Sequence, residues 1–251
     1  RSLLEAGRHA LIVDSAGDPA REEALAKRLV DHRVDAIITI PVDPASPHWA
    51  TVAKRVVLLS IGDGLPGAAT VAEVVFDNVV GVTDALRALA SAGHRDVVVL
   101  TPGLPSTPDR PAAGIVQRVA PDLGLNVRLL PCPHDLDGAT AVALKALDGG
   151  GAVDRPTAMF CFADSMAYGV YAAASELDLA IPADVSVLGY DDHPVSRLLT
   201  PPLSTFHWDV FALVESVVER VVAAIETGKR RRRKVLTPEL RSRGSVGPPP
   251  G

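Results

Sequence analysis

Residues 181–206 read IPADVSVLGYDDHPVSRLLTPPLSTF, and this stretch says most about the fold. Its apolar run at 185–188 predicts a buried β-strand, and Gly189 then lets the backbone turn. Asp191 and Asp192 follow directly, at the carboxyl end of the predicted strand. Ligands of open parallel sheets bind outside the carboxyl ends of strands, so this acidic pair predicts contact with a hydroxyl-rich molecule. A turn-capping role for the two aspartates is the alternative.

The same stretch ends in a segment that leads to another part of the molecule. Pro201 and Pro202 favour an extended path, because each proline ring fixes φ and removes a hydrogen-bond donor. We therefore expect the chain to leave its sheet here and to cross to a different element.

Apolar runs alternate with helical patterns along the whole chain. The strand-like runs cover residues 10–13, 36–40, 56–61, 71–76, 97–100, 127–130, 158–162 and 185–188. The first helical pattern begins at Asp18. Further helical patterns cover about 78–92, 137–148, 165–177 and 209–227, and the last of them ends at Gly228. This alternation predicts an α/β fold with parallel sheets and helices on both faces. The strands are too many for one compact sheet, so we expect two Rossmann-like lobes.

Composition limits the possible functions. The chain has 251 residues, 47% of them hydrophobic, which allows one large or two medium globular domains. No apolar run approaches the roughly 20 residues that a membrane span needs. The net charge of −5 gives no general reason to expect nucleic-acid binding by these residues. Cys132 and Cys161 form no CxxC pair, and Cys161 lies in an apolar strand, which favours a reduced thiol and a reducing cytosol.

The motifs that usually mark catalysis or cofactor binding are missing from the sequence. Residues 62–67 match GxGxxG, but Pro66 interrupts the pattern and a strand-like run follows, where a dinucleotide site needs a helix. The seven histidines show no metal-ligand spacing, and no GxSxG or P-loop sequence occurs. We therefore expect no catalytic residues, no metal and no cofactor.

A basic run covers residues 229–234, all of them Lys or Arg. Contact with phosphates is one interpretation. A solvated loop, whose cations suit the carboxyl end of the preceding helix, is the other and the one we favour.

Five segments together resemble the LacI/GalR (lactose-repressor/galactose-repressor) family of bacterial transcription regulators. They read IPADVSVLGYDD, LLTPPLST, RPTAMFCFADSMAYGV at 155–170, VFDNVVGVTDALRALASAGHRDVVVL at 75–100, and LTPELRSRGS at 236–245. The resemblance implies a periplasmic-binding-protein-like type I fold, with a ligand cleft between two lobes and chain crossings near residues 77, 205–206 and 238. On this basis we expect a first lobe of 1–77 plus 207–236 and a second lobe of 78–206 plus 237–251.

The resemblance also implies an effector site. Asp191 aligns with the family's ligand-contacting aspartate, and Asp164 with the acid of its Ala-Asn-Asp-type motif. Arg110 lies one residue from the position of a ligand arginine, Trp208 follows the crossing, and Ser60 lies at a strand end where an effector contact is expected. We predict these five as effector-binding residues.

Several positions depart from the sugar-binding pattern of the family. Ala163 replaces the asparagine that normally binds sugar, Pro111 occupies the arginine position, and Pro133 with His134 replaces an aromatic plate. The fold is therefore better supported by the resemblance than the chemical identity of the effector.

The resemblance predicts the effector-sensing and dimerising domain of a cytoplasmic regulator, which binds DNA through a headpiece in front of this chain. Residues 1–7 read like the tail of a helix, without a starting methionine or a secretory signal, which agrees with a fragment. The alternative is a periplasmic-type solute receptor of an importer, a class that usually lacks this combination of segments. An enzyme is a distant third interpretation.

Overall fold

The computed structural model describes residues 2–102, 112–148, 155–230 and 233–251. The chain forms two compact units. The described residues of 2–77 and 209–236 make the first unit, and those of 78–208 and 237–251 make the second. The chain therefore passes from one unit to the other at residues 77–78, 208–209 and 236–237.

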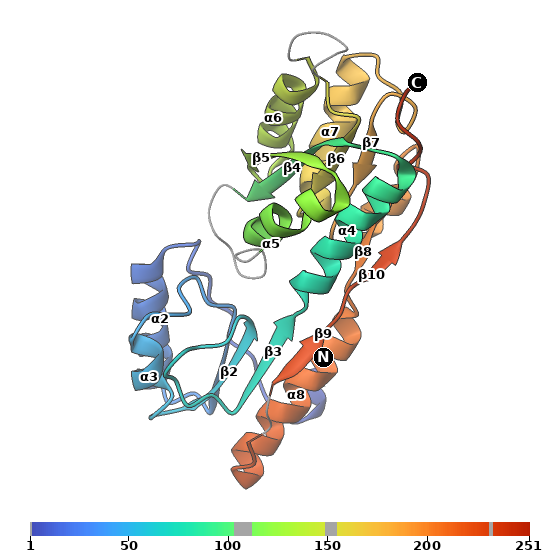
Figure 1. Cartoon of the computed structure of the whole chain (residues 1–251). Helices are drawn as coiled ribbons and strands as arrows, with labels where there is room; N and C mark the ends of the chain where they lie inside the picture. Colours follow the sequence, from blue (N-terminus) through green and yellow to red (C-terminus); the bar gives the residue numbers. More distant parts are fainter. Residues whose placement is uncertain (1, 103–111, 149–154, 231–232) are drawn as a thin grey trace. The chain divides into compact units, whose positions relative to one another are not determined.

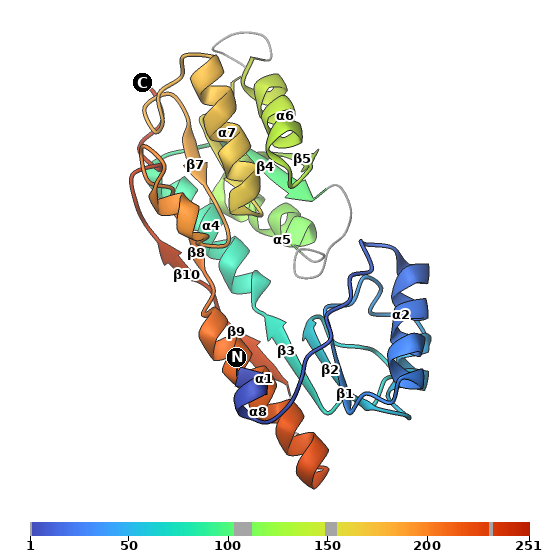
Figure 2. The same ribbon diagram turned by 180° about the vertical axis from the view of Figure 1, so that it is seen from behind.

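The first unit is built on a parallel sheet in the order β1-β2-β3-β9. Its strands are β1 (Ala36–Thr39), β2 (Val57–Gly62), β3 (Ala72–Phe76) and β9 (Lys234–Leu236). Helices α2 (Pro19–Asp31) and α3 (His48–Val52) cover one face, and α1 (Ser2–Glu5) and α8 (Val210–Thr227) cover the other (Figures 1 and 2). A buried core of Ala26, Val30, Ile37, Trp49, Val52, Leu58 and Leu65 joins α2 and α3 to the sheet.

Local sequence signals set the ends of these helices. The carboxylate of Asp18 accepts hydrogen bonds from the backbone N–H groups of Ala20, at 2.8 Å, and Arg21, at 3.3 Å, and thereby caps α2. Gly228 ends α8 in the left-handed region at φ 66°. Both predicted helix ends are confirmed.

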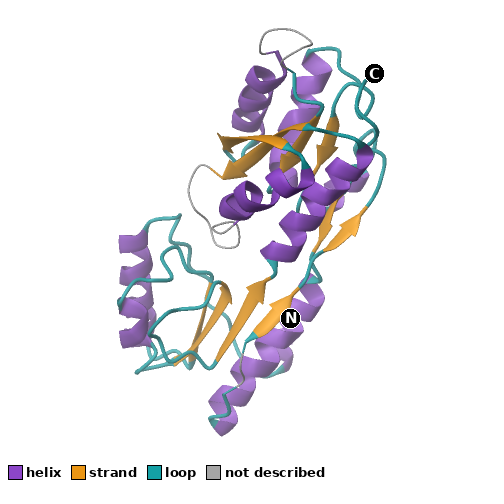
Figure 3. Cartoon of the chain, in the orientation of Figure 1, coloured by secondary structure: helices purple, strands orange, loops and turns teal. Residues whose placement is uncertain are grey.

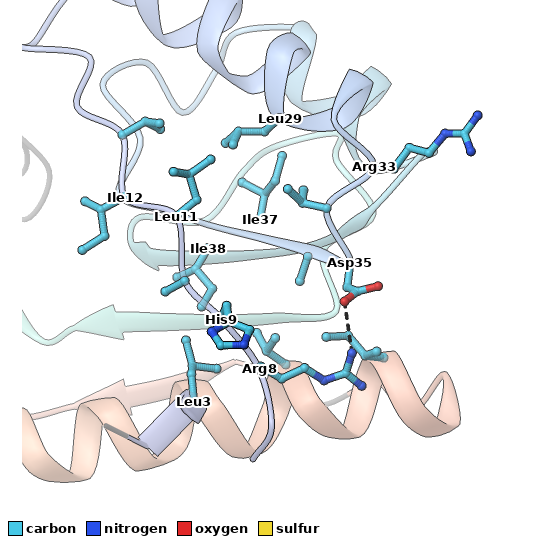
Figure 4. Close-up of a pocket in the computed structure, with 16 residues that line it drawn as sticks. Leu3, Arg8, His9, Leu11, Ile12, Leu29, Arg33, Asp35, Ile37 and Ile38 are labelled. Carbon is cyan, nitrogen blue, oxygen red and sulfur yellow. Dashed lines mark hydrogen bonds and ion pairs between the residues drawn. The ribbon is translucent and has the colours of Figure 1, made fainter. Parts of the chain in front are cut away.

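The predicted strand at residues 10–13 is wrong. A strand needs a hydrogen-bonded neighbour, and a cavity of about 420 Å³ separates this segment from the open edge of β1. Figure 4 shows Leu11 and Ile12 on one side of the cavity and Ile37 and Ile38 on the other, with Leu29 above them. The cavity is therefore a groove along the edge of the sheet, and its lining combines apolar side chains with those of Arg8, His9, Arg33 and Asp35.

The second unit contains a parallel sheet in the order β5-β4-β6-β7. Its strands are β4 (Asp96–Pro102), β5 (Asn126–Cys132), β6 (Ala158–Cys161) and β7 (Ser186–Leu188). Helices α6 (Leu136–Asp148) and α7 (Asp164–Glu176) lie on one face, and α4 (Asn78–Ala92) and α5 (Ala112–Val119) lie on the other (Figure 3). The runs at 97–100, 127–130, 158–162 and 185–188 thus mark true strands, and the parallel α/β class is confirmed.

Sequence reasoning missed several short elements. These are α3, α5, the 3-10 helices η1 (Pro121–Leu123) and η2 (Pro194–Arg197), and β8 (Thr205–His207), which pairs antiparallel with β10 (Glu239–Arg241). Each is shorter than the window over which a hydrophobic period can be recognised.

The carboxyl-terminal segment closes the second unit. The Ser245 hydroxyl donates to the Val187 carbonyl at 2.6 Å and accepts from the Ser204 backbone N–H at 2.7 Å. The fully buried His94 ring bonds to the Thr157 hydroxyl through Nδ1 and to the Gly247 carbonyl through Nε2, both at 2.9 Å. These bonds tie the end of the chain to β7 and to the start of β6.

None of the helices described is long and apolar enough to cross a membrane.

Candidate functional site

Two loops meet at the carboxyl ends of β6 and β7, and they form the polar centre of the second unit. The first loop leads into α7, whose first residue is Asp164. The second contains residues 189–193, directly after β7. Adjacent parallel strands end at the same edge of a sheet, which brings the two loops together.

The Asp164 carboxylate holds the second loop in place. Its Oδ1 accepts hydrogen bonds from the Tyr190 backbone N–H at 2.9 Å and from the Thr205 hydroxyl at 2.6 Å. Its Oδ2 accepts from the His193 backbone N–H at 2.9 Å and from the Ser196 hydroxyl at 2.5 Å. Asp164 is only 1% exposed, so these four donors compensate for the burial of its charge.

Thr205 and Gly189 complete this arrangement. The Thr205 hydroxyl oxygen also accepts from the backbone N–H groups of Asp191, at 3.1 Å, and Asp192, at 3.2 Å. A Cβ on Gly189 would lie 2.2 Å from Asp164 Oδ1, so only glycine lets the loop come this close. The glycine of the GYDD motif is thus explained by packing.

Asp191 is the exposed member of the acidic pair. Its Oδ2 accepts a hydrogen bond from the Asp164 backbone N–H at 3.2 Å, at the start of α7. The cap residue of that helix, Ala163, has no side-chain oxygen, so Asp191 supplies the missing acceptor from another strand end. The carboxylate therefore stands at the positive end of α7 with its backbone fixed by Thr205.

Asp192 has a different environment: its buried carboxylate lies at the centre of an ion cluster. Its carboxylate pairs with Arg243, with Arg197 at 3.3 Å and with His207 Nδ1 at 3.1 Å. Burial pushes its pKa up, but the hydrogen bonds and charges of Arg243 and Arg197 outweigh burial and hold the pKa below its usual value. Asp192 is therefore ionised at neutral pH and joins the loop to β8 and to the carboxyl-terminal segment.

Trp208 lies in an aromatic cluster around Tyr190. The two rings meet edge to face with centroids 5.7 Å apart, and Phe206 packs on Tyr190 at 5.3 Å. Trp208 is 9% exposed. Its ring thus packs against the GYDD loop through Tyr190.

The remaining two predicted residues are not joined to this centre by the structure. Ser60 lies in β2 of the first unit, paired with Thr39 and Glu73, and it is fully buried. Its hydroxyl has no hydrogen-bond partner among the described residues. Arg110 lies outside the described residues.

Polar side chains surround the start of α7. Ser165 Oγ lies 3.4 Å from His134 Nδ1, and the Tyr168 hydroxyl lies 3.0 Å from Ser196 Oγ. Burial raises the pKa of Tyr168, and the negative charges of Asp164 and Asp191 raise it further. The phenol therefore stays protonated at neutral pH and can donate a hydrogen bond.

Thr205, Ser196 and Arg243 are structurally important residues that sequence reasoning missed. They come from three segments that are far from Asp164 or Asp192 in the chain, and no local period connects them.

The fold and the site together define a class of protein. Two α/β units with parallel sheets, three chain crossings and a rigid acidic loop at the strand ends are typical of a binding protein of the periplasmic type.

Comparison with known sequences identifies the family. The chain belongs to the periplasmic binding protein-like domain family, whose sequence profile matches residues 86–246, and it is an effector-binding domain of the LacI/GalR type. It is 27% identical to the ribose operon repressor of Escherichia coli (strain K12), over 98% of this chain and 75% of the repressor. It is 28% identical to the transcriptional regulator MalR of Streptomyces coelicolor, over 100% of this chain and 75% of MalR.

A solved structure supports the same assignment. The LacI family transcriptional regulator from Lactobacillus casei, with bound glucose, has a TM-score of 0.84 and 25% identity, and the match covers 98% of this chain and 91% of that one. These relatives are named as transcriptional repressors or regulators. The predicted function as the effector-binding domain of a transcriptional regulator is thus confirmed.

Proposed function

We propose that the chain binds a small hydroxyl-rich effector through the Asp191 loop and thereby modulates DNA binding by the regulator of which it is a part. The supporting observation is the fixed, exposed carboxylate of Asp191 at the start of α7. A carboxylate accepts hydrogen bonds from two neighbouring hydroxyls of a sugar or polyol, and a rigid loop loses little entropy when it binds.

The relatives support this class of effector. One is named as a ribose operon repressor, and another was solved with bound glucose. The altered residues Ala163, Pro133 and His134 argue that the hydroxyl pattern recognised here differs from that of the sugar-binding relatives.

We assign different roles to the predicted site residues. Asp191 contacts the effector and Trp208 provides apolar surface beside it, whereas Asp164 positions the loop because its four acceptor sites are already used. Ser60 stays a prediction, because its hydroxyl is fully buried within β2. Arg110 stays a prediction from the family resemblance.

We further propose that the two units are the two lobes of the family, and that the protein acts as a homodimer in the cytoplasm. DNA contact belongs to a segment outside residues 1–251. No catalytic role is proposed. A periplasmic-type receptor is the second candidate, supported by the shared fold.

A thermal-shift screen tests the proposed function. Ribose, glucose, other monosaccharides, polyols and nucleosides are added to the wild type, to Asp191→Asn and to the matched surface control Asp122→Asn. A ligand at about 100 times its Kd adds about 2.7 kcal/mol, which is a shift of several degrees. We expect at least one hydroxyl-rich compound to stabilise the wild type and the control, and Asp191→Asn to lose that shift.

Asparagine is the informative substitution because it keeps an acceptor for the Asp164 N–H and so keeps the cap of α7. Equal shifts in Asp191→Asn and the wild type would show that Asp191 does not contact the effector. No shift with any hydroxyl-rich compound would refute the proposed effector class.

A further inference from the structure

Tyr190 lies where the three chain crossings reach the second unit. The first residues of that unit at the crossings are Asn78, Trp208 and the pair Thr237 and Pro238. These residues come from distant parts of the sequence. Each of the three crossing segments contacts Tyr190 or lies against Gly81, the glycine on which Tyr190 packs.

The contacts are specific. The Tyr190 hydroxyl donates to Asn78 Oδ1 at 3.2 Å, and its ring meets Trp208 at 5.7 Å. A Cβ on Gly81 would lie 1.9 Å from the Tyr190 hydroxyl and 2.7 Å from Pro238 Cγ, so both groups lie against the same bare backbone of α4. The Tyr190 side chain thus packs beside the first crossing, the second crossing and the third.

The backbone of Tyr190 belongs to the acidic loop. Its N–H donates to Asp164 Oδ1 at 2.9 Å, and the next residue is Asp191. The ring is 4% exposed and is held on its other sides by Phe160 and Phe162. A displacement of the loop backbone therefore moves a ring that has little room to adjust alone.

The Tyr190 hydroxyl makes a buried hydrogen bond that is not needed to fill the space around the ring. A phenylalanine would fill the same space without burying a polar group, whereas the tyrosine buries a hydroxyl and pairs it with Asn78. That bond connects the loop at the strand end to the first residue of α4, 112 residues away in the sequence.

We infer that Tyr190 is a positioning residue that couples the Asp191 loop to the three crossings of the described chain, at residues 77–78, 208–209 and 236–237, so that a displacement of the loop changes the stability of these segments. The link to an effector rests on the proposed function. The mechanical coupling itself can be tested in the effector-free chain, so its failure is distinguishable from failure of the proposed function.

Hydrogen-exchange mass spectrometry of the whole chain provides the test, with Tyr190→Phe, Asn78→Ala and the double variant. The matched control is Tyr171→Phe, which removes a tyrosine hydroxyl of the same unit that donates to the Pro201 carbonyl at 2.7 Å. Loss of a hydrogen bond worth about 1 kcal/mol corresponds to about fivefold faster exchange.

We expect Tyr190→Phe and Asn78→Ala each to speed exchange about fivefold in four segments: residues 76–80, 189–193, 206–209 and 236–240. The double variant should be no faster than the faster of the two single variants, because both remove the same bond. Tyr171→Phe should leave the four segments unchanged.

Three results would overturn the inference. One is an effect of Asn78→Ala that stays within the first turn of α4, since a lost local contact explains that. Another is additivity of the two substitutions. The third is a uniform increase over the whole unit, which is the mark of general destabilisation and not of coupling.

Discussion

Replacing Asp164 by asparagine tests whether this residue is a structural acceptor. The substitution keeps the shape of the side chain but turns one carboxylate oxygen into an NH₂ group. If the amide oxygen takes the Oδ1 position, it keeps the bonds from the Tyr190 N–H and the Thr205 hydroxyl. The NH₂ group then faces the His193 N–H and the Ser196 hydroxyl.

The magnitude follows from these two contacts. The Ser196 hydroxyl can rotate and accept, but the His193 N–H has no other role than donor and loses its acceptor. A buried donor left unpaired costs about 1–3 kcal/mol, and hydrogen bonds to a charged acceptor contribute about 1.5–3 kcal/mol each. We therefore expect Asp164→Asn to lower the free energy of unfolding of the second unit by about 2–4 kcal/mol.

Urea unfolding followed by tryptophan fluorescence measures this loss. Trp49 belongs to the first unit and Trp208 to the second, so a Trp49→Phe background lets fluorescence report on the second unit. Asp122→Asn, at an exposed position of the same unit, is the control and should change stability by less than about 0.5 kcal/mol. If Asp164→Asn is as mild as this control, Asp164 is not a structural acceptor and a direct ligand role regains priority.

Three further predictions concern the second unit. Gly189→Ala should cost about 2–3 kcal/mol in urea unfolding because its Cβ has no room. Gly114→Ala in helix α5 brings its Cβ only to an ordinary van der Waals distance, 3.5 Å, from the Arg118 side chain, and should stabilise by about 0.5–1 kcal/mol. Equal effects would contradict the packing argument. Burial lowers the pKa of His94 despite its bond to a backbone carbonyl. The stabilising contribution of the neutral His94 ring is therefore complete above pH 6.5 and is lost as the pH falls through the folded-state pKa. Melting temperatures from pH 8 to pH 5 should show a steeper fall for the wild type than for His94→Gln. Arg243→Ala removes the most buried cation beside Asp192 and should cost about 2–4 kcal/mol, with a loss under 1 kcal/mol showing that the remaining partners suffice.

The sequence predicted the elements that carry their own period. The apolar runs of β4, β6 and β7 and the capped ends of α2 and α8 are where local patterns placed them. The run at 10–13 has the same composition as a strand, but strand formation depends on a neighbour, which composition does not reveal.

The site was predicted less completely for a similar reason. The GYDD motif pointed to a ligand-facing strand end, but it did not show that the two aspartates differ, one exposed and one in an ion cluster. That difference depends on Arg243, 51 residues away, and on Thr205, which holds both backbone N–H groups. Long-range partners of this kind are set by the topology of the sheets and not by local sequence.

The groove beside β1 has a consequence for how this polypeptide behaves in concentrated solution. An unpaired strand edge offers a row of backbone donors and acceptors to any extended chain, and here it is flanked by Ile38, Ile40, Leu11 and Ile12, of which Ile12 is 90% exposed. Such an edge is a template for strand addition between molecules. We therefore expect copies of residues 1–251 to associate along this short length of β1, which light scattering at rising concentration checks.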